Sequence, residues 1–347
     1  MSIYINNRLI GPDAPPYVIA EMSANHNGRL ENALAIVDAA KKAGADAVKL
    51  QTYRADTITL DGEGDEFIIH GGLWDGKTLH QLYLEAHLPW EWHKPLFERA
   101  RAQGITIFSS PFDNTAVDLL EDLNAPAYKI ASYEAVDLPL IRYAASTGKP
   151  MIISTGMADE AEIQEAIDAA RSAGCKELAI LHCVSGYPAP AADYNLRTIP
   201  DMIERFGLVT GLSDHTLDNT TAIASIALGA AIIEKHFTLD RNGGGPDDSF
   251  SLEPTDLVAL CHGVRTAWEA LGRVDYGCKS SEKGSVQYRR SLYFVKDLRV
   301  GEPITADAVR SVRPGNGLPP KFLDQVVGRK AARAIRKNTP VSFEDCA

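Results

Sequence analysis

Short hydrophobic runs alternate with longer amphipathic stretches along most of the chain. Eight apolar runs bounded by turn residues are typical of buried strands. They are Val18–Glu21, Ala47–Gln51, Ile105–Ser109, Ala127–Ala131, Met151–Ser154, Leu178–His182, Leu208–Leu212 and Ala231–Lys235. Helical periodicity separates most of them, for example over Leu30–Ala43, Glu91–Gln103, Asp159–Ala173 and Asn219–Leu228. Apolar strands that alternate with helices predict a parallel sheet, and eight of them predict closure into an α/β fold, the (β/α)8 TIM barrel.

An open doubly wound sheet is the competing architecture for this pattern. That fold carries a glycine-rich dinucleotide loop after its first strand, whereas this chain reads AEMSANHNG there. The closed barrel is therefore the better prediction.

Two segments interrupt the alternation of strands and helices. Residues 56–88 are too long for an ordinary βα loop, and we expect them to form a lid or wall over the mouth of the barrel. After a closing helix at Pro254–Leu271, the polar stretch YGCKSSEKGS predicts a linker. The sequence thus predicts a barrel over residues 1–275, a linker over 276–288 and a small domain of short strands, SLYFVKDLRVGEPI and AARAIRKNTPVSF, over 289–347.

Charge is distributed unevenly between these parts. The chain carries a net charge of −11, but residues 1–288 carry −17 and residues 289–347 carry +6. The acidic body argues against a nucleic acid partner. The basic tail is either a solvated surface, a module that docks on an acidic barrel, or a source of cations for an anionic substrate.

The composition is that of an ordinary globular protein, with 45% hydrophobic and 23% charged residues. No stretch approaches the roughly 20 apolar residues of a membrane-spanning helix, and the first residues do not resemble a signal peptide. The five cysteines form no CxxC pair, which argues against a disulfide framework or a structural zinc site. We therefore expect a cytoplasmic protein with no membrane partner.

Polar residues gather at the predicted carboxyl ends of the strands, where active sites of eight-stranded barrels lie. They are Glu21, Lys49, Gln51, Ser109, Ser110, Lys129, Ser132, Glu134, Ser154, Thr155, His182, Ser185, Ser213, Asp214, His215, Glu234, Lys235 and His236. Charges at such positions are costly when unpaired. Some of them could be structural ion pairs, but so many together predict a polar mouth that binds a ligand.

Two pairs of residues point to particular chemistry. His215 and His236 end neighbouring strands, so they either meet over the mouth as ligands of a divalent metal or serve as core histidines. Lys49 and Lys129 either grip a phosphate or, if one is desolvated, form a Schiff base. Spacing alone leaves both alternatives open.

Several ordered segments resemble the sialic acid synthase family of phosphoenolpyruvate-condensing enzymes. They are AEMSANHNGRLENALAIVDAAKKAGADAVKLQTY, FSSPFD, YKIASYE, ISTGMA, GLSDHT, EKHFTLD and GPDDSFSLEP. The tail, with RRSLYFVKDLRVGEPI and VRPGNGLPPKF, is similar to the antifreeze-like (SAF) C-terminal domain of that family. Within the family, the segment EFIIHGGLWDGKTLHQLYLEAHLPWEWH and the phrase SVRPGNGLPPKF look most like the pseudaminic acid synthases.

The resemblance implies a reaction. Phosphoenolpyruvate condenses with an N-acetylated amino sugar, its C–O bond is cleaved, and phosphate is released. The subfamily implies 2,4-diacetamido-2,4,6-trideoxy-altrose as the sugar, with N-acetylneuraminic or legionaminic acid synthesis as the alternative. More remote alternatives are a Schiff-base aldolase and a nonenzymatic sugar-binding or ice-binding protein.

The resemblance also implies roles for individual residues. His215 and His236 would bind a divalent metal, manganese by expectation, with cobalt or magnesium possible, and Glu21, Glu134 and His236 would be catalytic. The residues that match the family's phosphoenolpyruvate site are Lys49, Ser110, Lys129, Ser132, Ser185 and Ser213, where Ser110 replaces the threonine of some relatives. Those that would face the sugar are Gln51, Tyr187, Asp247 and Arg313, the last reaching the barrel of a second chain in a domain-swapped homodimer.

The segment FIIHGGLWD departs from the members that form sialic acid. Phe67, Ile68, Ile69 and Trp74 would make an apolar wall, which suits the methyl group of a 6-deoxy sugar better than a hydroxyl-rich one. Alternatively, these side chains simply pack the loop onto the barrel.

Overall fold

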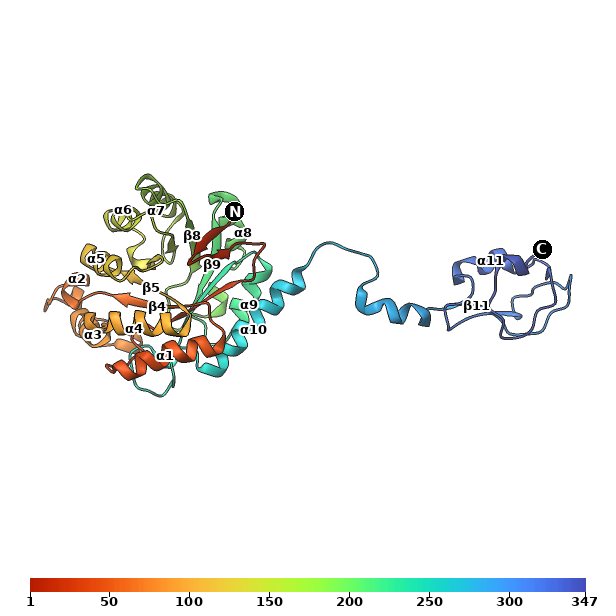
Figure 1. Cartoon of the computed structure of the whole chain (residues 1–347), viewed down its shortest axis with the longest axis horizontal. Coiled ribbons are helices and arrows are strands. Elements are labelled where there is room, and N and C mark those ends of the chain that lie inside the picture. The colour runs from red at the N-terminus through yellow and green to blue at the C-terminus, as the bar shows by residue number, and fades with distance from the viewer. The chain divides into compact units, whose positions relative to one another are not determined.

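The eight apolar runs form eight parallel strands that close into a barrel (Figure 1). The computed structural model describes residues 1–347. The strands are β3 (Tyr17–Glu21), β4 (Ala47–Thr52), β5 (Thr106–Pro111), β6 (Tyr128–Ile130), β7 (Met151–Ser154), β8 (Leu178–Cys183), β9 (Val209–Asp214) and β10 (Ile232–His236). The last strand pairs with the first, so that His236 lies opposite Glu21. The barrel prediction is confirmed, and every expected strand lies within a few residues of its predicted bounds.

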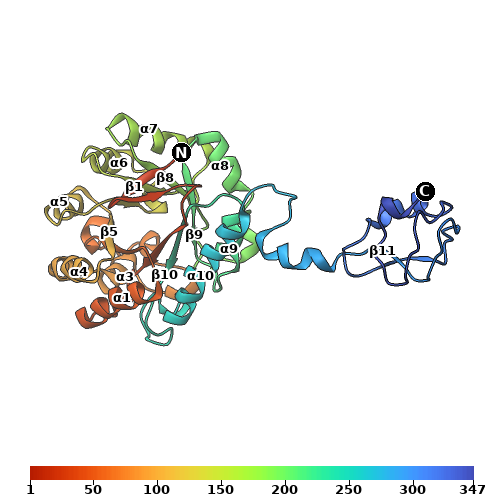
Figure 2. The ribbon, with the colours of Figure 1, turned by 45° about the vertical axis from the view of Figure 1, so that its right-hand side comes forward.

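Helices surround the barrel (Figure 2). They are α1 (Leu30–Ala43), α4 (Trp90–Gln103), α5 (Asn114–Asp122), α6 (Leu138–Ala145), α7 (Glu160–Ser172), α8 (Thr198–Phe206), α9 (Thr220–Ala227) and α10 (Pro254–Leu271). Each buries one apolar stripe against the strands, as Ile36, Val37 and Ala40 do in α1. Local chemistry sets the ends: the Asp113 carboxylate caps α5, and Gly44 ends α1 with a φ of 95° that only glycine adopts easily. The bounds predicted for α1 and α10 are confirmed.

An N-terminal hairpin closes one end of the barrel, which the sequence pattern did not predict. Its strands are β1 (Ile3–Ile5) and β2 (Arg8–Ile10). Ile3, Ile5 and Ile10 join a buried cluster with residues from the starts of the barrel strands, such as Tyr17 and Ala47. Because the hairpin covers the amino ends of the strands, a ligand site has to lie at the carboxyl ends.

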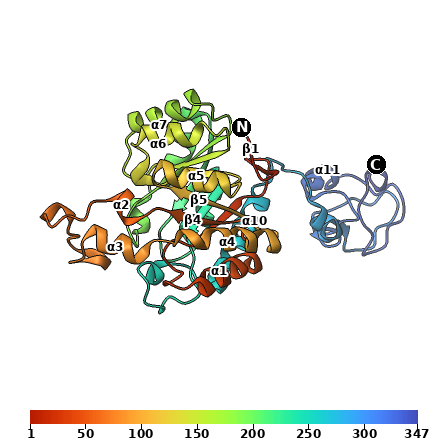
Figure 3. The same ribbon diagram turned by 60° about the vertical axis from the view of Figure 1, so that its left-hand side comes forward.

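The long segment after β4 contains two short helices, α2 (Ala55–Ile58) and α3 (Leu79–Ala86) (Figure 3). Between them lie two single turns of 3-10 helix, Asp65–Phe67 and Gly72–Trp74. Thr78 and Gln81 form a reciprocal capping box at the start of α3. The sequence analysis identified this insertion but did not predict its helices.

The chain divides into two compact units, Met1–Gly272 and Arg273–Ala347. The second unit begins with exposed residues that include a 3-10 helix at Ser280–Tyr288. Its strands β11 (Ser291–Phe294) and β12 (Val309–Val312) pair antiparallel, and α11 spans Leu323–Val326. The stretch 331–343, which we expected to contain a strand, makes only isolated bridges such as Leu298 with Ile335. No helix in the structure has both the length and the apolar composition needed to span a membrane.

Candidate active site

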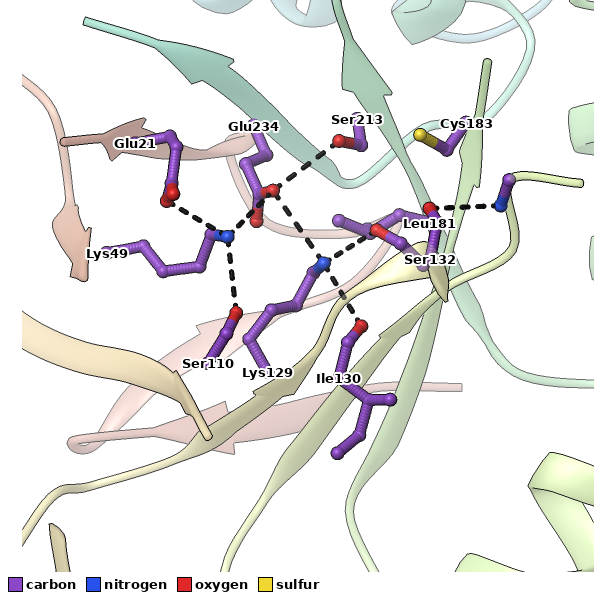
Figure 4. Close-up of polar contacts among 12 residues, drawn as sticks. Glu21, Lys49, Ser110, Lys129, Ile130, Ser132, Leu181, Cys183, Ser213 and Glu234 are labelled. Atoms are coloured by element: carbon purple, nitrogen blue, oxygen red, sulfur yellow. Dashed lines mark hydrogen bonds and ion pairs between the residues drawn. The ribbon is translucent and has the colours of Figure 1, made fainter. Parts of the chain in front are cut away.

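Two lysines and two glutamates form a buried charge network at the carboxyl ends of the strands (Figure 4). Lys49 Nζ lies 2.9 Å from Glu21 Oε2 and 3.3 Å from Glu234 Oε1, and Lys129 Nζ lies 3.7 Å from the same Glu234 oxygen. All four side chains are buried. Charges removed from water require partners of opposite sign, and here two ammonium groups balance two carboxylates.

Hydroxyl groups surround the two ammonium groups of this network. Lys129 Nζ donates to Ser154 Oγ at 2.6 Å and Lys49 Nζ donates to Ser110 Oγ at 3.4 Å. Ser213 Oγ donates to Glu234 Oε1 at 3.4 Å. An anion that entered here would meet two cations and several hydroxyl donors, which is the donor set that phosphate requires.

Ser132 and Ser185 converge on Gly156, beside the network. The Gly156 N–H donates to Ser132 Oγ at 3.1 Å. A Cβ atom at Gly156 would lie 2.3 Å from Ser185 Oγ and 2.8 Å from Ser132 Oγ. Only glycine leaves these hydroxyls free, so the strand ends form a small cradle with polar walls.

The two predicted metal ligands do face one another. The ring centroids of His215 and His236 are 5.4 Å apart. His215 Nδ1 hydrogen-bonds to the Val184 carbonyl at 2.8 Å, so Nε2 is the nitrogen that a metal could use, and the buried His236 Nδ1 has no hydrogen-bond partner. Burial and the neighbouring His215 hold the pKa of His236 well below its usual range, so this imidazole is neutral.

These two imidazoles fit a divalent transition metal, although they are a partial ligand set. No group of three or more histidine, cysteine or acidic side chains is arranged to hold a metal ion. Asp247 Oδ2 lies 3.8 Å from His236 Nδ1. A metal held by the two histidines would therefore take further ligands from water or substrate, as catalytic sites with open positions do.

A second group of polar residues links the charge network to Asp247. Gln51 Nε2 donates to Glu21 Oε1 at 2.8 Å and to Ser23 Oγ at 2.9 Å, and the Ser23 hydroxyl donates to Asp247. Ser23 has a φ of 44°, a backbone conformation that is uncommon outside glycine and frequent at functional sites. The chain of contacts connects β3, β4 and the loop after β10.

Two carboxyl groups are poised to exchange protons near neutral pH. Burial raises the pKa of Glu21 to about 7 against the opposing effect of Lys49. Burial likewise raises the pKa of Glu134 to about 7, and its Oε2 atom has no hydrogen-bond partner. Such values suit general acid and base catalysis.

A pocket of about 340 Å³ opens above the charge network. Gln51 and His236 lie two residues beyond Lys49 and Glu234 on the same strands, so they share a face with the network and stand one step nearer the mouth. The polar and hydroxyl-bearing residues that line the pocket include Ser23, Gln51, Glu134, Tyr187, His236 and Asp247. Its large apolar lining residues, which we call the apolar wall, are Ile58, Ile69, Trp74, Leu79, Leu82 and Phe112.

The expected composition of this wall is corrected in part. Ile69 and Trp74 line the pocket, whereas Phe67 and Ile68 do not. The Phe67 ring packs over Gly62 inside the insertion, where a Cβ atom on that glycine would meet the ring at 2.3 Å. Helix α3 supplies Leu79 and Leu82 instead.

Other predicted residues fall into different environments. Lys235 Nζ binds Asp214 Oδ2 at 2.9 Å and the carbonyls of Thr216 and Asp218, so it braces the loop that carries His215. Arg313 follows β12 in the second unit, where it is exposed and makes no ion pair. Its role stays a prediction.

Some residues that the structure adds to the site were not assigned a role from the sequence. Ser23, Ser154, Gly156 and Glu234 contact predicted site residues, and their positions at strand ends were the only signal. Cys183, at the end of β8, is a fifth. Burial would raise its thiol pKa, but the hydrogen bonds to His215 and Ser132 and the charges of His215 and Lys129 together outweigh burial and lower the pKa to about 7.

Comparisons with known proteins agree with this architecture. The model of the NeuB family matches residues 36–276, and the model of the SAF domain matches residues 289–346. Pseudaminic acid synthase of Helicobacter pylori is 43% identical over 333 residues, which cover 95% of this chain and 98% of that protein.

Two solved structures are similar over most of the chain. The spore coat polysaccharide biosynthesis protein SpsE of Bacillus subtilis has a TM-score of 0.69 and 34% identity, and the match covers 100% of this chain and 99% of that one. N-acetylneuraminic acid synthetase of Leptospira borgpetersenii has a TM-score of 0.73 and 31% identity, with coverage of 82% and 95%. By these matches and by its fold, the chain belongs to the NeuB family.

Proposed function

We propose that this chain condenses phosphoenolpyruvate with 2,4-diacetamido-2,4,6-trideoxy-altrose to give pseudaminic acid and inorganic phosphate, with cleavage of the C–O bond of phosphoenolpyruvate. The observation that carries the proposal is the stacking of two subsites in one barrel mouth. A double-lysine anion site, with Lys49 and Lys129, lies directly below a pocket that contains His236 and Asp247. The 43% identity to a pseudaminic acid synthase supports this choice of sugar.

The charge network and the cradle would hold phosphoenolpyruvate. Its phosphate and carboxylate are anionic, so they compete with Glu234 for the ammonium groups of Lys49 and Lys129. Hydroxyl donors complete the site, namely those of Ser110, Ser132, Ser185 and Ser213, with Ser154 added by the structure. An anion held there leaves its reactive carbon facing the pocket above.

His215 and His236 would hold a divalent metal, Mn²⁺ by our expectation, with Co²⁺ or Mg²⁺ as alternatives. When bound, such an ion supplies Lewis-acid polarisation of the sugar aldehyde. Gln51, Tyr187 and Asp247 line the same pocket and would orient the open-chain sugar, with its aldehyde carbon towards C3 of phosphoenolpyruvate.

Two carboxyl groups would move protons during the reaction. The C–C bond forms between C3 of phosphoenolpyruvate and the aldehyde carbon, and the new alkoxide takes a proton. Water then adds at C2, and phosphate leaves from the resulting tetrahedral centre. Glu134 lines the pocket and would handle the proton of the water or the phosphate, while Glu21, oriented by Gln51, would assist at the sugar; these two roles are interchangeable.

Phosphate release from phosphoenolpyruvate, assayed against a panel of sugars, tests the proposal. The altrose-configured sugar should give a higher kcat/KM than N-acetylmannosamine or the precursor of legionaminic acid. With ¹⁸O in the bridging position of phosphoenolpyruvate, the label should appear in the released phosphate. Faster turnover of N-acetylmannosamine would show that the chain synthesises N-acetylneuraminic acid and not pseudaminic acid. A pyruvate adduct trapped by borohydride would instead indicate a Schiff-base aldolase.

We also propose that the second unit completes the barrel of another chain in a homodimer. Tyr133, Val136, Met157 and Leu217 follow the carboxyl ends of β6, β7 and β9 and are 55–63% exposed, an apolar rim that a partner could cover. The acidic barrel and the basic tail are electrostatically complementary. Arg313 would then bind the acetamido-bearing sugar from the second chain.

Subunit mixing tests this arrangement. Arg313→Ala and Lys129→Ala should each be inactive, and mixing them under conditions of subunit exchange should restore about one quarter of the sites, because half of the dimers then contain one intact site. No recovery despite demonstrated exchange would mean that Arg313 acts on its own barrel.

A further inference from the structure

The pocket has two chemically different sets of lining residues, one polar and one apolar, that come from different parts of the chain. The polar set comes from strand ends and the loops that follow them, whereas most of the apolar wall comes from the insertion between β4 and α4. Leu82 on α3 is only 7% exposed, although α3 is a short helix within an insertion. On the same helix Leu84 is 57% exposed and does not line the pocket.

Contacts on two sides fix the wall against the barrel mouth. Trp74 Nε1 donates to the Pro246 carbonyl at 3.1 Å, and its ring centroid lies 6.1 Å from that of Tyr187. The Tyr187 ring in turn lies 4.3 Å from the ring of His215. On the other side, Tyr83 packs edge-on against Tyr53 at 5.7 Å. The wall is therefore held over the same pocket that His236 lines, with Trp74 beside Tyr187 at one end and Tyr83 beside Tyr53 at the other.

This geometry assigns the two ends of the acceptor sugar, if the proposed function holds. The aldehyde carbon must lie beside His236, so the rest of the sugar meets the remaining lining of the pocket, which is largely the apolar wall. The aliphatic side chains there, Ile58, Ile69, Leu79 and Leu82, cannot accept or donate a hydrogen bond, and a hydroxyl among them would lose its water without gaining a partner. A methyl group would instead gain by leaving water.

We infer that the apolar wall is the specificity-determining subsite for the deoxygenated, acyl-bearing end of the acceptor, with Leu82 and Ile69 at its centre. The class of acceptor is an N-acylated 6-deoxy hexose. Three tyrosine hydroxyls of residues that line the pocket, those of Tyr53, Tyr83 and Tyr133, make no hydrogen bond in the structure, and they suit the amide of one acetamido group. The inference rests on the proposed function for the identity of the reaction. The apolar wall itself predicts that, in any series of acceptor sugars, the 6-deoxy sugar is preferred over its 6-hydroxy counterpart.

The test compares two sugars that differ only at C6, 2,4-diacetamido-2,4,6-trideoxy-altrose and its 6-hydroxy counterpart. The wild-type protein should favour the 6-deoxy sugar about 10-fold to 100-fold in kcat/KM, the range that a hydrophobic pocket achieves. Leu82→Asn, which is nearly isosteric, should reduce this ratio about 10-fold by lowering kcat/KM for the 6-deoxy sugar. Leu84→Asn is the matched control on the same helix, and its ratio should equal that of the wild type.

A second variant and a binding assay separate specificity from folding. Ile69→Asn, at a half-buried loop position, should shift the ratio in the same direction as Leu82→Asn. The affinity for phosphoenolpyruvate, measured by calorimetry, should be unchanged in both variants because the charge network does not contain them. Equal turnover of the two sugars by the wild type would overturn the inference, as would unchanged ratios in both variants.

Failure of the proposed function gives a different result. If the wild type uses neither diacetamido sugar but turns over N-acetylmannosamine, the pseudaminic assignment is wrong. The same ratio is then measured with N-acetylmannosamine and its 6-deoxy analogue. A preference for the 6-deoxy form that Leu82→Asn reduces would support the subsite, and its absence would overturn it.

Discussion

The charge network and the apolar wall meet in one pocket, but the chain builds them by different means. The network residues Glu21, Lys49, Lys129 and Glu234 lie on barrel strands, whose register and closure fix their positions. The wall belongs largely to an insertion that the barrel does not need for closure. Chemistry shared by a family can therefore stay on the strands while specificity changes in the insertion.

The largest effect should come from the histidine pair, which we propose to hold the metal among the polar residues of the pocket. His215→Ala or His236→Ala should lower kcat by roughly 10³-fold or more, as loss of a catalytic metal ligand does. Both variants should stay folded, because they lie at the mouth and not among the packed layers of the barrel. Chelation of the wild type should abolish phosphate release, and Mn²⁺ should restore it. Full activity in the presence of chelator would contradict the proposed role of the metal.

The next effect separates two buried lysines that both lie near the carboxyl ends of their strands. Lys129→Met should reduce the affinity for phosphoenolpyruvate at least 100-fold, because one of the two cations of the anion site is lost. Lys235→Met should retain that affinity within a few-fold but lower the Tm by several degrees, since Asp214 is left as a buried charge without its partner. Calorimetric titration and thermal melts measure both; equal loss of affinity would place Lys235 in the anion site too.

The structure explains why the sequence predicted one half of the pocket better than the other. In a barrel, a polar residue that ends an apolar strand lies at the mouth, so Lys49, Gln51 and His236 were identifiable without coordinates. The sequence also placed Glu234 at the mouth. Its ion pairs with both lysines depend on how β10 is positioned relative to β4 and β6 in the barrel, and hydrophobic periodicity does not predict this.

For the apolar wall, the sequence does not predict which side chains line the pocket. The run FIIHGGLWD contains five large apolar residues, and no local signal distinguishes Ile69 and Trp74, which line the pocket, from Phe67, which packs on Gly62. Helix α3 is only eight residues long, too short for its periodicity to stand out. Tertiary packing decides these orientations.

A smaller effect tests the cradle beside the network. Gly156→Ala should raise the KM for phosphoenolpyruvate roughly 10-fold, because the new methyl group would crowd the hydroxyls of Ser132 and Ser185. The φ angle of Gly156 is not in the left-handed region, so the backbone should tolerate alanine. Gly186→Ala is the control, since its Cβ atom would meet nothing closer than 3.6 Å. If the two variants have the same KM, the cradle does not bind phosphoenolpyruvate.

The smallest predicted effect concerns Glu134, which lines the same pocket as the apolar wall. It is a pH-dependent change in the stability of the fold, which can be measured without substrate. Burial raises the pKa of this carboxyl from 4.5 to about 7, so the folded state holds its proton more tightly than the unfolded state. Below about pH 4.5 both states are protonated and burial of the acid carries no pH-dependent penalty. As the pH rises from about 4.5 to 7, the unfolded state ionises first, and the stability of the fold falls. Above about pH 7 the loss is complete and constant.

Glu134→Gln removes this pH-dependent loss of stability. The pKa of Glu21 is also raised by burial, but Glu21 is present in both proteins, so its effect cancels in the comparison. The variant should therefore match the wild-type Tm near pH 4.5 and exceed it by a few degrees at pH 8. Glu269→Gln, at an exposed position on α10, should show a difference in Tm that does not change with pH. If the difference in Tm between Glu134→Gln and the wild type were also independent of pH, the Glu134 carboxyl would be ionised across this range. Its proposed role as the group that exchanges a proton with water or phosphate near neutral pH would then lose its physical basis.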